Sequence, residues 1–180
     1  MSSPQQDDLA TAQPPHTVVR PVMPADIPEI VAMIRELAEY ERALHEVHAT
    51  EEHLHRTLFA DEPAVFGHVA EVDGAVAGMA IWYLNYSTWL GAHNLYLEDL
   101  YMRPQHRGGG TGKLLLQTLA QICVQRGYAR LEWWVLDWNP ARGFYAAMGA
   151  DALTEWIPYR VSGEALTSLA GAPSQDPPVV

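Results

Sequence analysis

The feature that most constrains this chain is a glycine-rich turn, because four of the five residues at 108–112 are glycine. An apolar run, Leu95–Met102, precedes the turn, and a helix-forming segment, Lys113–Ile122, follows it. The first backbone N–H groups of a helix have no partner inside the helix, so a strand that enters a helix through glycines makes an anion site. The interval from Arg103 to Lys113 holds two arginines, one lysine and one histidine and no acid, although the chain has a net charge of -11. The turn therefore predicts a phosphate cradle.

Two common phosphate motifs do not match this turn. A nucleotide-triphosphate loop requires Gly and Ser or Thr at the positions that Arg107 and Leu114 occupy. A dinucleotide fingerprint requires a third glycine where Lys113 or Leu115 stands. The pattern that remains is Arg-x-x-Gly-x-Gly over residues 107–112, after a strand and before a helix.

The charge balance narrows the class of partner. The chain of 180 residues has 22 acidic and 11 basic side chains, a surface that repels nucleic acid and attracts small cations such as amines. No run approaches the ~18 apolar residues of a membrane span. Met1–Thr17 lacks the basic start and apolar middle of a signal peptide. We therefore expect a cytoplasmic protein with no nucleic-acid or membrane partner.

The cysteine and histidine residues indicate neither a reactive thiol nor a metal. Cys123 is the only cysteine, so no disulfide can form within the chain, and its helical spacing from Leu115 and Leu119 predicts a core position. Four of the eight histidines fall within 45–55, across a predicted helix break, and no acid or cysteine joins them in a ligand pattern. We expect a solvated histidine face and no bound metal.

Hydrophobic periodicity and turn residues predict the order of the elements. Strands are expected at about 17–22, 65–72, 75–86, 94–102, 129–137 and 150–161, and helices from Asp26, from Thr50 to about 59, at about 110–126 and from Asn139. Asp73-Gly74 suits a hairpin turn between antiparallel strands, and the strand, helix and strand over 94–137 imply a parallel crossover. The predicted fold class is α/β, with a mixed, mostly antiparallel twisted sheet and helices on both faces. We expect one domain over 17–162, a disordered leader at 1–16 and a proline-containing tail at 163–180.

The first helix places a carboxylate on its apolar side. Asp26, with Glu29 three residues on, is a capping pattern for its start. The apolar stripe that follows consists of Ile27, Ile30, Val31, Ile34, Leu37 and Ala38. Glu41 takes the next position at this spacing. Either the helix end emerges into solvent there or it borders a cleft, and the spacing leaves both open.

Glu98 and Asp99 interrupt an otherwise buried strand. Burying two ionised acids without partners costs several kcal/mol, so we expect both to face a polar cleft. The alternative is that one of them forms a local cap or salt bridge. Adjacent residues of a strand point to opposite faces unless a bulge intervenes.

The glycine turn and the segments behind it resemble a known enzyme superfamily. Arg-Gly-x-Gly-x-Gly at 107–112, followed by Asn139, Phe144-Tyr145 and Gly149-Ala150, resembles the GNAT superfamily of acetyl-CoA-dependent N-acetyltransferases. The resemblance covers about Val18–Tyr159. Three further segments are similar to the diamine (spermidine/spermine) acetyltransferase branch, which includes thialysine acetyltransferases: Leu37–Glu41, Trp89–Gly91 and Tyr96–Asp99.

The resemblance implies a coenzyme site. Acetyl-CoA would donate the acetyl group and leave as coenzyme A, with amides of the turn on its pyrophosphate and the strand at Leu100–Met102 beside its pantetheine arm. The cofactor-binding residues that the resemblance implies are Leu100, Tyr101, Met102, Arg107, Gly108, Gly109, Gly110, Thr111, Gly112, Lys113, Asn139 and Phe144.

The resemblance also implies direct attack of a primary amine on the thioester. An alkyl amine has a pKa of about 10.4 and is protonated at pH 7, so a group must accept its proton. Glu98 is expected as that base, directly or through water, and Tyr145 as the acid for the departing thiolate. From the residues alone, Tyr145 reads as a packing residue. The substrate-binding residues that the resemblance implies are Tyr40, Glu41, Trp89, Glu98 and Asp99.

One departure from the branch leaves the acceptor open. Where diamine acetyltransferases usually have Asp-Pro-Trp, this chain has Ser87-Thr88-Trp89, so a carboxylate for a distal ammonium is missing. A diamine, a polyamine and a lysine-like amine are all candidates. The alternatives are a protein or antibiotic acceptor and a non-catalytic acyl-CoA-binding sensor. The resemblance further implies a homodimer with the region after Gly149 at or near the interface.

Overall fold

The computed structural model describes residues 15–171, so residues 1–14 of the predicted leader and residues 172–180 of the predicted tail lie outside the described residues. The chain divides into two compact units, Met1–Trp134 and Val135–Val180. The single domain expected over 17–162 stays a prediction.

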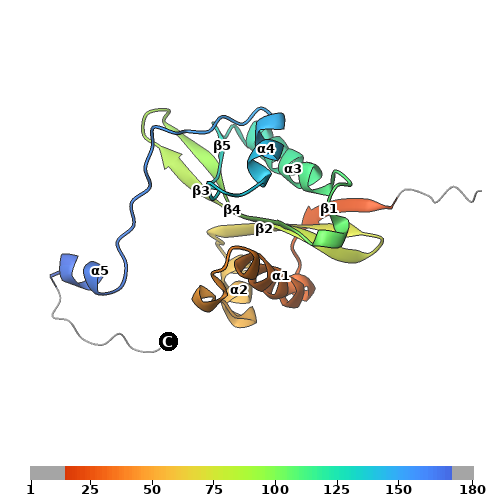
Figure 1. Ribbon diagram of the computed structural model, residues 1–180, viewed down its shortest axis with the longest axis horizontal. Helices are drawn as coiled ribbons and strands as arrows, with labels where there is room; N and C mark the ends of the chain where they lie inside the picture. Colours follow the sequence, from red (N-terminus) through yellow and green to blue (C-terminus); the bar gives the residue numbers. More distant parts are fainter. Residues whose placement is uncertain (1–14, 172–180) are drawn as a thin grey trace, which may run out of the picture. The chain divides into compact units, whose positions relative to one another are not determined.

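The first unit is built on a five-stranded sheet (Figure 1). Its strands, which follow one another across the sheet in chain order, are β1 (Thr17–Pro21), β2 (Val65–Val72), β3 (Ala75–Ser87), β4 (Ala92–Met102) and β5 (Leu131–Glu132). The first three pairings are antiparallel, and β4 pairs with β5 in parallel. Asp73 and Gly74, with φ of 50° and 83°, form the predicted hairpin turn between β2 and β3. The predicted fold class is confirmed.

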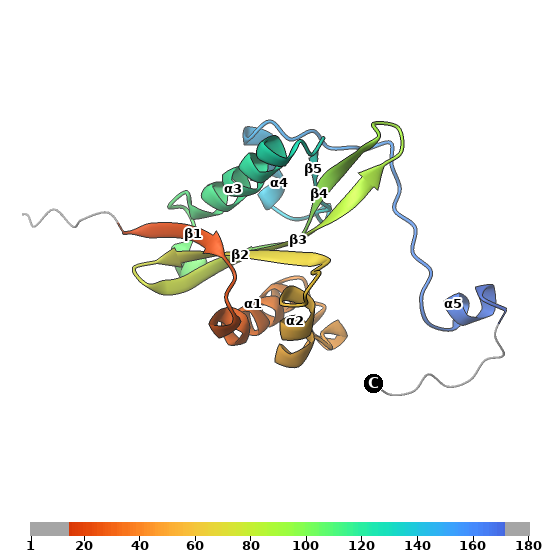
Figure 2. The ribbon, with the colours of Figure 1, turned by 180° about the vertical axis from the view of Figure 1, so that it is seen from behind.

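Helices cover both faces of this sheet (Figures 1 and 2). One face carries α1 (Ile27–Tyr40) and α2 (Glu51–Leu58), and the other carries α3 (Thr111–Arg126), which makes the parallel crossover. Single 3₁₀ turns precede or link these helices: η1 (Pro24–Asp26), η2 (Leu44–Glu46) and η3 (Pro104–His106). Within residues 15–171, no helix is long and apolar enough to cross a membrane.

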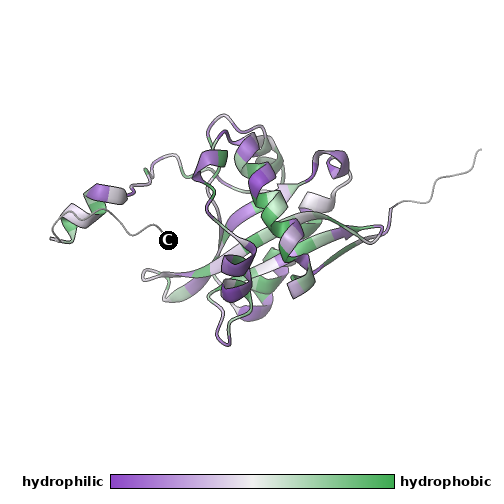
Figure 3. Ribbon diagram, turned by 90° about the horizontal axis from the view of Figure 1, so that it is seen from below, coloured by the Kyte–Doolittle hydropathy of each residue, from purple (hydrophilic) through white to green (hydrophobic). Residues whose placement is uncertain are grey.

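The core forms where α1 packs on the middle of the sheet, in which hydrophobic residues gather (Figure 3). Its buried members are Ile30, Met33, Val69, Met79, Ile81 and Tyr101. Met33, which the predicted stripe omitted, is fully buried, whereas Val31 is half-buried. The buried residues of α1 are spaced three apart, so Met33 lies on the same side of the helix as Ile30, the side that meets the sheet. On α3 the buried residues include Leu115, Leu119 and Cys123, so the predicted core position of the cysteine is confirmed.

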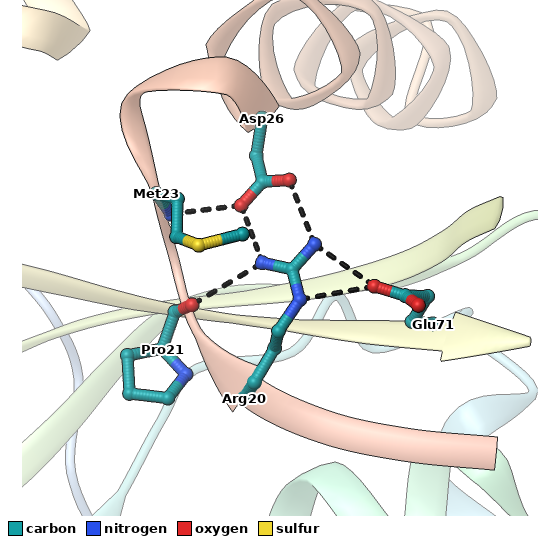
Figure 4. A network of polar contacts seen from close by, with 5 residues as sticks. All are labelled: Arg20, Pro21, Met23, Asp26 and Glu71. Atoms are coloured by element: carbon teal, nitrogen blue, oxygen red, sulfur yellow. Dashed lines mark hydrogen bonds and ion pairs between the residues drawn. The ribbon is translucent and has the colours of Figure 1, made fainter. Parts of the chain in front are cut away.

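An ion-pair network joins β1 to the start of α1 (Figure 4). Arg20 donates to Asp26 at 2.6 and 2.9 Å and to Glu71 at 3.0 Å. Asp26 also accepts from the backbone N–H of Met23 at 2.8 Å, and the bonds from Arg20 hold the pKa of its carboxyl below the usual range. Asp26 is the N-cap residue of α1 as predicted, but its side chain makes no cap hydrogen bond to that helix. The carboxylate instead closes the preceding turn η1 and binds the arginine.

The last third of the chain departs from the prediction. The strand expected at 129–137 forms only at β5, and the strand expected at 150–161 does not form. A strand requires a hydrogen-bonded neighbour. The backbone hydrogen bonds made by the described residues 150–161 are local, such as that from Thr154 N to Ala152 O at 3.1 Å. Pro158 further removes one donor from the segment.

The described part of the second unit, residues 135–171, contains two short helices, α4 (Ala141–Ala147) and α5 (Gly163–Leu169). Asn139 Oδ1 accepts a hydrogen bond from the Ala141 N–H at 2.9 Å and so caps α4. Gly149, with φ of 85°, follows the end of that helix. Gly149 confirms the predicted end of α4. The N-cap residue is Pro140, one residue after the predicted Asn139, although Asn139 still accepts a hydrogen bond from the first residue of the helix. The helix α5 was not predicted.

Candidate active site

The glycine turn opens α3 with unpaired amides. Gly110, the N-cap of α3, and Gly108 have φ of 84° and 82°, a left-handed conformation that favours glycine. A Cβ built on Gly108, Gly109 or Gly110 would meet no atom within 4 Å, so the space beside the turn is open. Within the part of the chain that the structure describes, the backbone N–H groups of 108–113 donate no hydrogen bond. The turn therefore fits an anionic group such as a pyrophosphate.

Arg107, at the start of the turn, reaches toward the end of α1. Its guanidinium carbon lies 5.8 Å from the ring centre of Tyr40 and 5.5 Å from that of Tyr101. Its Nε donates to the carbonyl of Met102 at 2.8 Å. These cation–π contacts join the turn to the helix end that carries Tyr40 and Glu41.

A β-bulge lies in β4 at Glu98. Ile81 of β3 pairs with Asp99, but the next residue, Trp82, pairs with Leu97, so Glu98 is the extra residue. Ile81 belongs to the core under α1, and directly paired residues share a face, so Asp99 lies on the α1 face. Tyr96 pairs with Tyr83, two residues from Ile81, and lies on that face as well.

The bulge helps to decide whether Glu98 and Asp99 face a polar cleft or whether one of them forms a local cap or salt bridge. Glu98 is two residues from Tyr96 and therefore shares its face, which Asp99 joins through the bulge. Both carboxylates are thus on the α1 face, although adjacent strand residues ordinarily point to opposite faces. Neither makes a salt bridge among the described residues. A shared cleft is favoured over a local salt bridge.

Glu41 joins this pair of acids. Burial, together with the charges of Glu98 and Glu41, raises the pKa of Asp99 to about 6. Burial also raises the pKa of the half-buried Glu41 carboxyl. The interaction with Asp99 favours the cleft reading for Glu41 over a fully solvated helix end. We call Glu41, Glu98 and Asp99 the carboxylate cluster.

Two tyrosines that sequence reasoning did not assign border the cluster. The rings of Tyr83 and Tyr96 lie 5.0 Å apart on adjacent strands. Burial and the negative charge of Glu98 raise the pKa of both phenols, that of Tyr96 to about 12. Trp134 meets the Tyr96 ring edge-on at 6.0 Å. The sequence contained a signal for Tyr96, because residues two apart on a strand share a face and Tyr96 is two residues before Glu98.

The other predicted residues of the first unit lie in different settings. Leu100 and Met102 are half-buried in β4. The side chain of Tyr101 is in the core, which leaves only its backbone for the predicted contact with the coenzyme. Thr111 is buried and Lys113 is exposed at the start of α3. Trp89 is 86% exposed in the turn between β3 and β4, and its role stays a prediction. Ser87, where the branch has an acid, accepts from the N–H of Leu90 at 3.3 Å and closes this turn.

The predicted residues of the second unit lie on and before α4. Asn139 holds the first turn of that helix through its side-chain cap. Phe144 and Tyr145 are both half-buried, with ring centres 5.4 Å apart. Their roles at the coenzyme and in proton transfer stay predictions.

The described residues also show how the remaining ionisable groups are arranged. Between residues 15 and 171 there is no group of three or more histidine, cysteine or acidic side chains that could hold a metal ion. Arg103 pairs with Glu29 at 2.7 Å and with Glu36 at 3.2 Å, and so fastens α1 to the end of β4. Arg103 is therefore paired with acids of α1 and not with the carboxylate cluster.

Comparison with known proteins shows the family to which the chain belongs. Residues 30–150 match the model of the acetyltransferase (GNAT) family. The chain is 39% identical over 167 residues to a thialysine N-epsilon-acetyltransferase of Mus musculus, covering 86% of this chain and 98% of that protein. It is 32% identical over 197 residues to an L-ornithine N5-acetyltransferase of Arabidopsis thaliana, covering 84% and 86%. An integron cassette protein from V. cholerae superposes with a TM-score of 0.71 at 27% identity, covering 87% of this chain and 98% of that one. The chain therefore belongs to the GNAT family and is an N-acetyltransferase.

Proposed function

We propose that the protein transfers an acetyl group from acetyl-CoA to the primary amine of a small cationic acceptor. The observation that carries this proposal is the bulge at Glu98, which turns two carboxylates to one face beside Glu41. Acids without ion-pair partners suit a cationic ligand. The relatives support the acceptor class, because thialysine and L-ornithine each present a side-chain amine.

The coenzyme site is proposed at the glycine turn. Acetyl-CoA supplies the acetyl group activated as a thioester when it is bound. The amides of 108–113 would bind its pyrophosphate, with Arg107 and Lys113 as nearby positive charges. The backbone of Leu100–Met102 and the side chains of Asn139 and Phe144 are the further candidates.

The proton transfers are assigned to residues of this chain. Glu98 is exposed at the bulge and would accept the amine proton, directly or through water. The carboxylate of Asp99 would hold the substrate cation, which lowers its pKa again and keeps it ionised. Tyr40, Glu41 and Trp89 would complete the acceptor side. Tyr145 would protonate the departing thiolate, so no covalent enzyme intermediate is required.

A homodimer and a cytoplasmic location are proposed as well. The second unit exposes large apolar side chains in a segment without strand partners, among them Trp156, Ile157 and Tyr159 at 64, 72 and 90%. Such side chains are enriched at interfaces between copies. The location rests on the sequence expectation alone.

The test is a screen for thiol release from acetyl-CoA across thialysine, lysine, ornithine, short diamines, spermidine, an aminoglycoside and a peptide. We expect turnover with the small amines and its loss in Glu98→Gln. Tyr145→Phe should lower kcat while coenzyme binding stays nearly intact, since the ring still packs. Turnover with the aminoglycoside or peptide alone would replace the proposed acceptor. Coenzyme binding without thiol release from any amine would identify a sensor.

A further inference from the structure

A cavity lies where β1 ends and β2 begins, apart from the carboxylate cluster. It has a volume of about 370 Å³ and lies where the last turn of α2 and the last turns of α3 approach the sheet. Its walls include Phe59, Phe66, Trp82, Ile122, His68 and Arg126. Trp82 and Phe66 alternate with Ile81 and so lie on the α3 face, opposite the carboxylate cluster.

Two stacked aromatic side chains line one wall of the cavity. The rings of Phe66 and Trp82 stack with centres 4.5 Å apart and planes inclined by 23°. Trp82 is 3% exposed and Phe66 is half-buried, so Phe66 is the member of the stack that offers ring surface to the cavity. Ile122 and Phe59 add apolar surface from the two helices. Such walls favour a flat apolar body.

His68 offers an unused hydrogen-bond donor beside this stack. The side chain is 8% exposed, and its Nδ1 accepts from the Trp82 indole N–H at 3.1 Å. Burial lowers the pKa of His68, so the ring is neutral and its proton is on Nε2. Among the described residues, no group accepts a hydrogen bond from that Nε2–H. His68 lines the cavity, so its Nε2–H is a donor that a ligand in the cavity can use.

Arg126 gives the cavity a positive charge. It is the last residue of α3, is exposed, and makes no ion pair among the described residues. Among residues 15–171, no acidic side chain lines the cavity, although the chain as a whole is acidic. One donor and one cation beside an aromatic wall match a carboxylate on a flat ring.

We infer that the cavity between Trp82, His68 and Arg126 binds a small aromatic carboxylate. The ring lies against the Phe66–Trp82 stack, and the carboxylate accepts from His68 Nε2–H and from the Arg126 guanidinium. This site is separate from the acetyl-transfer site and does not depend on the acceptor proposed above.

Binding is tested by ¹⁹F NMR titration of the full chain with 4-fluorobenzoate, with 4-fluorobenzamide as the uncharged probe. We expect saturable binding of the benzoate below about 10 mM and weaker binding of the benzamide. Arg126→Gln should weaken the benzoate about tenfold and leave the benzamide unchanged, because one charged hydrogen bond is lost. The matched control, Arg35→Gln on the exposed side of α1, should bind both as the unmodified protein does.

Two further experiments test whether the probes bind in this cavity. Ile122→Trp fills the space and should abolish binding of both probes, and near-normal thermal unfolding would show that the variant is folded. Excess coenzyme A should leave the benzoate signal unchanged. The inference is overturned if coenzyme A displaces the benzoate, if Ile122→Trp binds it normally, or if neither probe binds.

Discussion

Asp99 is a carboxyl group held partly out of water beside two other acids. Its pKa of about 6 lies above the ordinary 3.8, first because of burial and then because of Glu98 and Glu41. The folded chain therefore binds this proton more tightly than the unfolded chain does. The stability that the proton confers is present at acid pH and is lost as the pH rises from about 4 through about 6.

Asp99→Asn should therefore stabilise the protein at pH 7 and have little effect at pH 4. A gain of about 3 kcal/mol in the free energy of unfolding is expected at pH 7, since the pKa rises from 3.8 to about 6 and each pKa unit corresponds to about 1.4 kcal/mol. Urea unfolding at the two pH values measures it. An equal gain at both would show that packing, and not the charge, is the cause.

Glu98→Gln tests the base at the same scale. The value of kcat/KM should fall by about 10²- to 10⁴-fold at pH 7 and recover as the pH approaches that at which the free amine is neutral. Tyr145→Phe is the control, because the loss of an acid for the thiolate gives no such recovery. A uniform loss across pH with raised KM would instead make Glu98 a substrate-binding anion.

At the scale of elements, the glycine turn and the bulge set the two halves of the site. The turn fixes left-handed residues at Gly108 and Gly110, so that amides at the start of α3 stay unpaired. The bulge places Glu98 and Asp99 on one face of β4. Arg107 contacts Tyr40 at the end of α1, so the two halves are in physical contact.

Gly110→Asp should abolish coenzyme binding, whereas Gly110→Asn should weaken it much less. Both side chains tolerate the left-handed conformation better than others do, and the site has open space for either. The two variants differ only in charge, so the contrast isolates repulsion of the pyrophosphate. Calorimetry with coenzyme A measures both. Equal affinities would exclude the turn as the cradle.

The elements also show which parts of the site were predictable. The turn, the Asn139 cap and the Asp73-Gly74 hairpin are local signals, and the structure contains each of them. The bulge depends on which residue of β3 faces Asp99, a pairing between distant segments that spacing within β4 does not encode. The prediction of a strand at 150–161 was wrong for the same reason, because a strand depends on pairing with a segment that is distant in the sequence.

At the scale of the whole molecule, the sheet of the first unit is well covered, while the second unit exposes its apolar segment. The described part of 150–161 has no strand partner, and its large side chains face solvent. An exposed apolar segment of this size indicates an interface.

The protein should therefore sediment as a homodimer, and Ile157→Asp should shift it toward monomer by placing a charge in the interface. Glu155→Gln is the matched control, because it removes a charge from the same segment and should leave the dimer intact. Sedimentation velocity over a range of concentrations measures both. A wild-type monomer at every concentration would contradict the proposal.

The single thiol of the chain gives the molecule an internal reporter. Cys123, on the buried side of α3, is 6% exposed, and burial raises the pKa of its thiol, so the reactive thiolate is scarce as well as shielded. A disulfide reagent in solution therefore reacts only with molecules in which α3 has lifted from the sheet. The rate of thiol labelling therefore measures how often α3 opens, and no engineered probe is required.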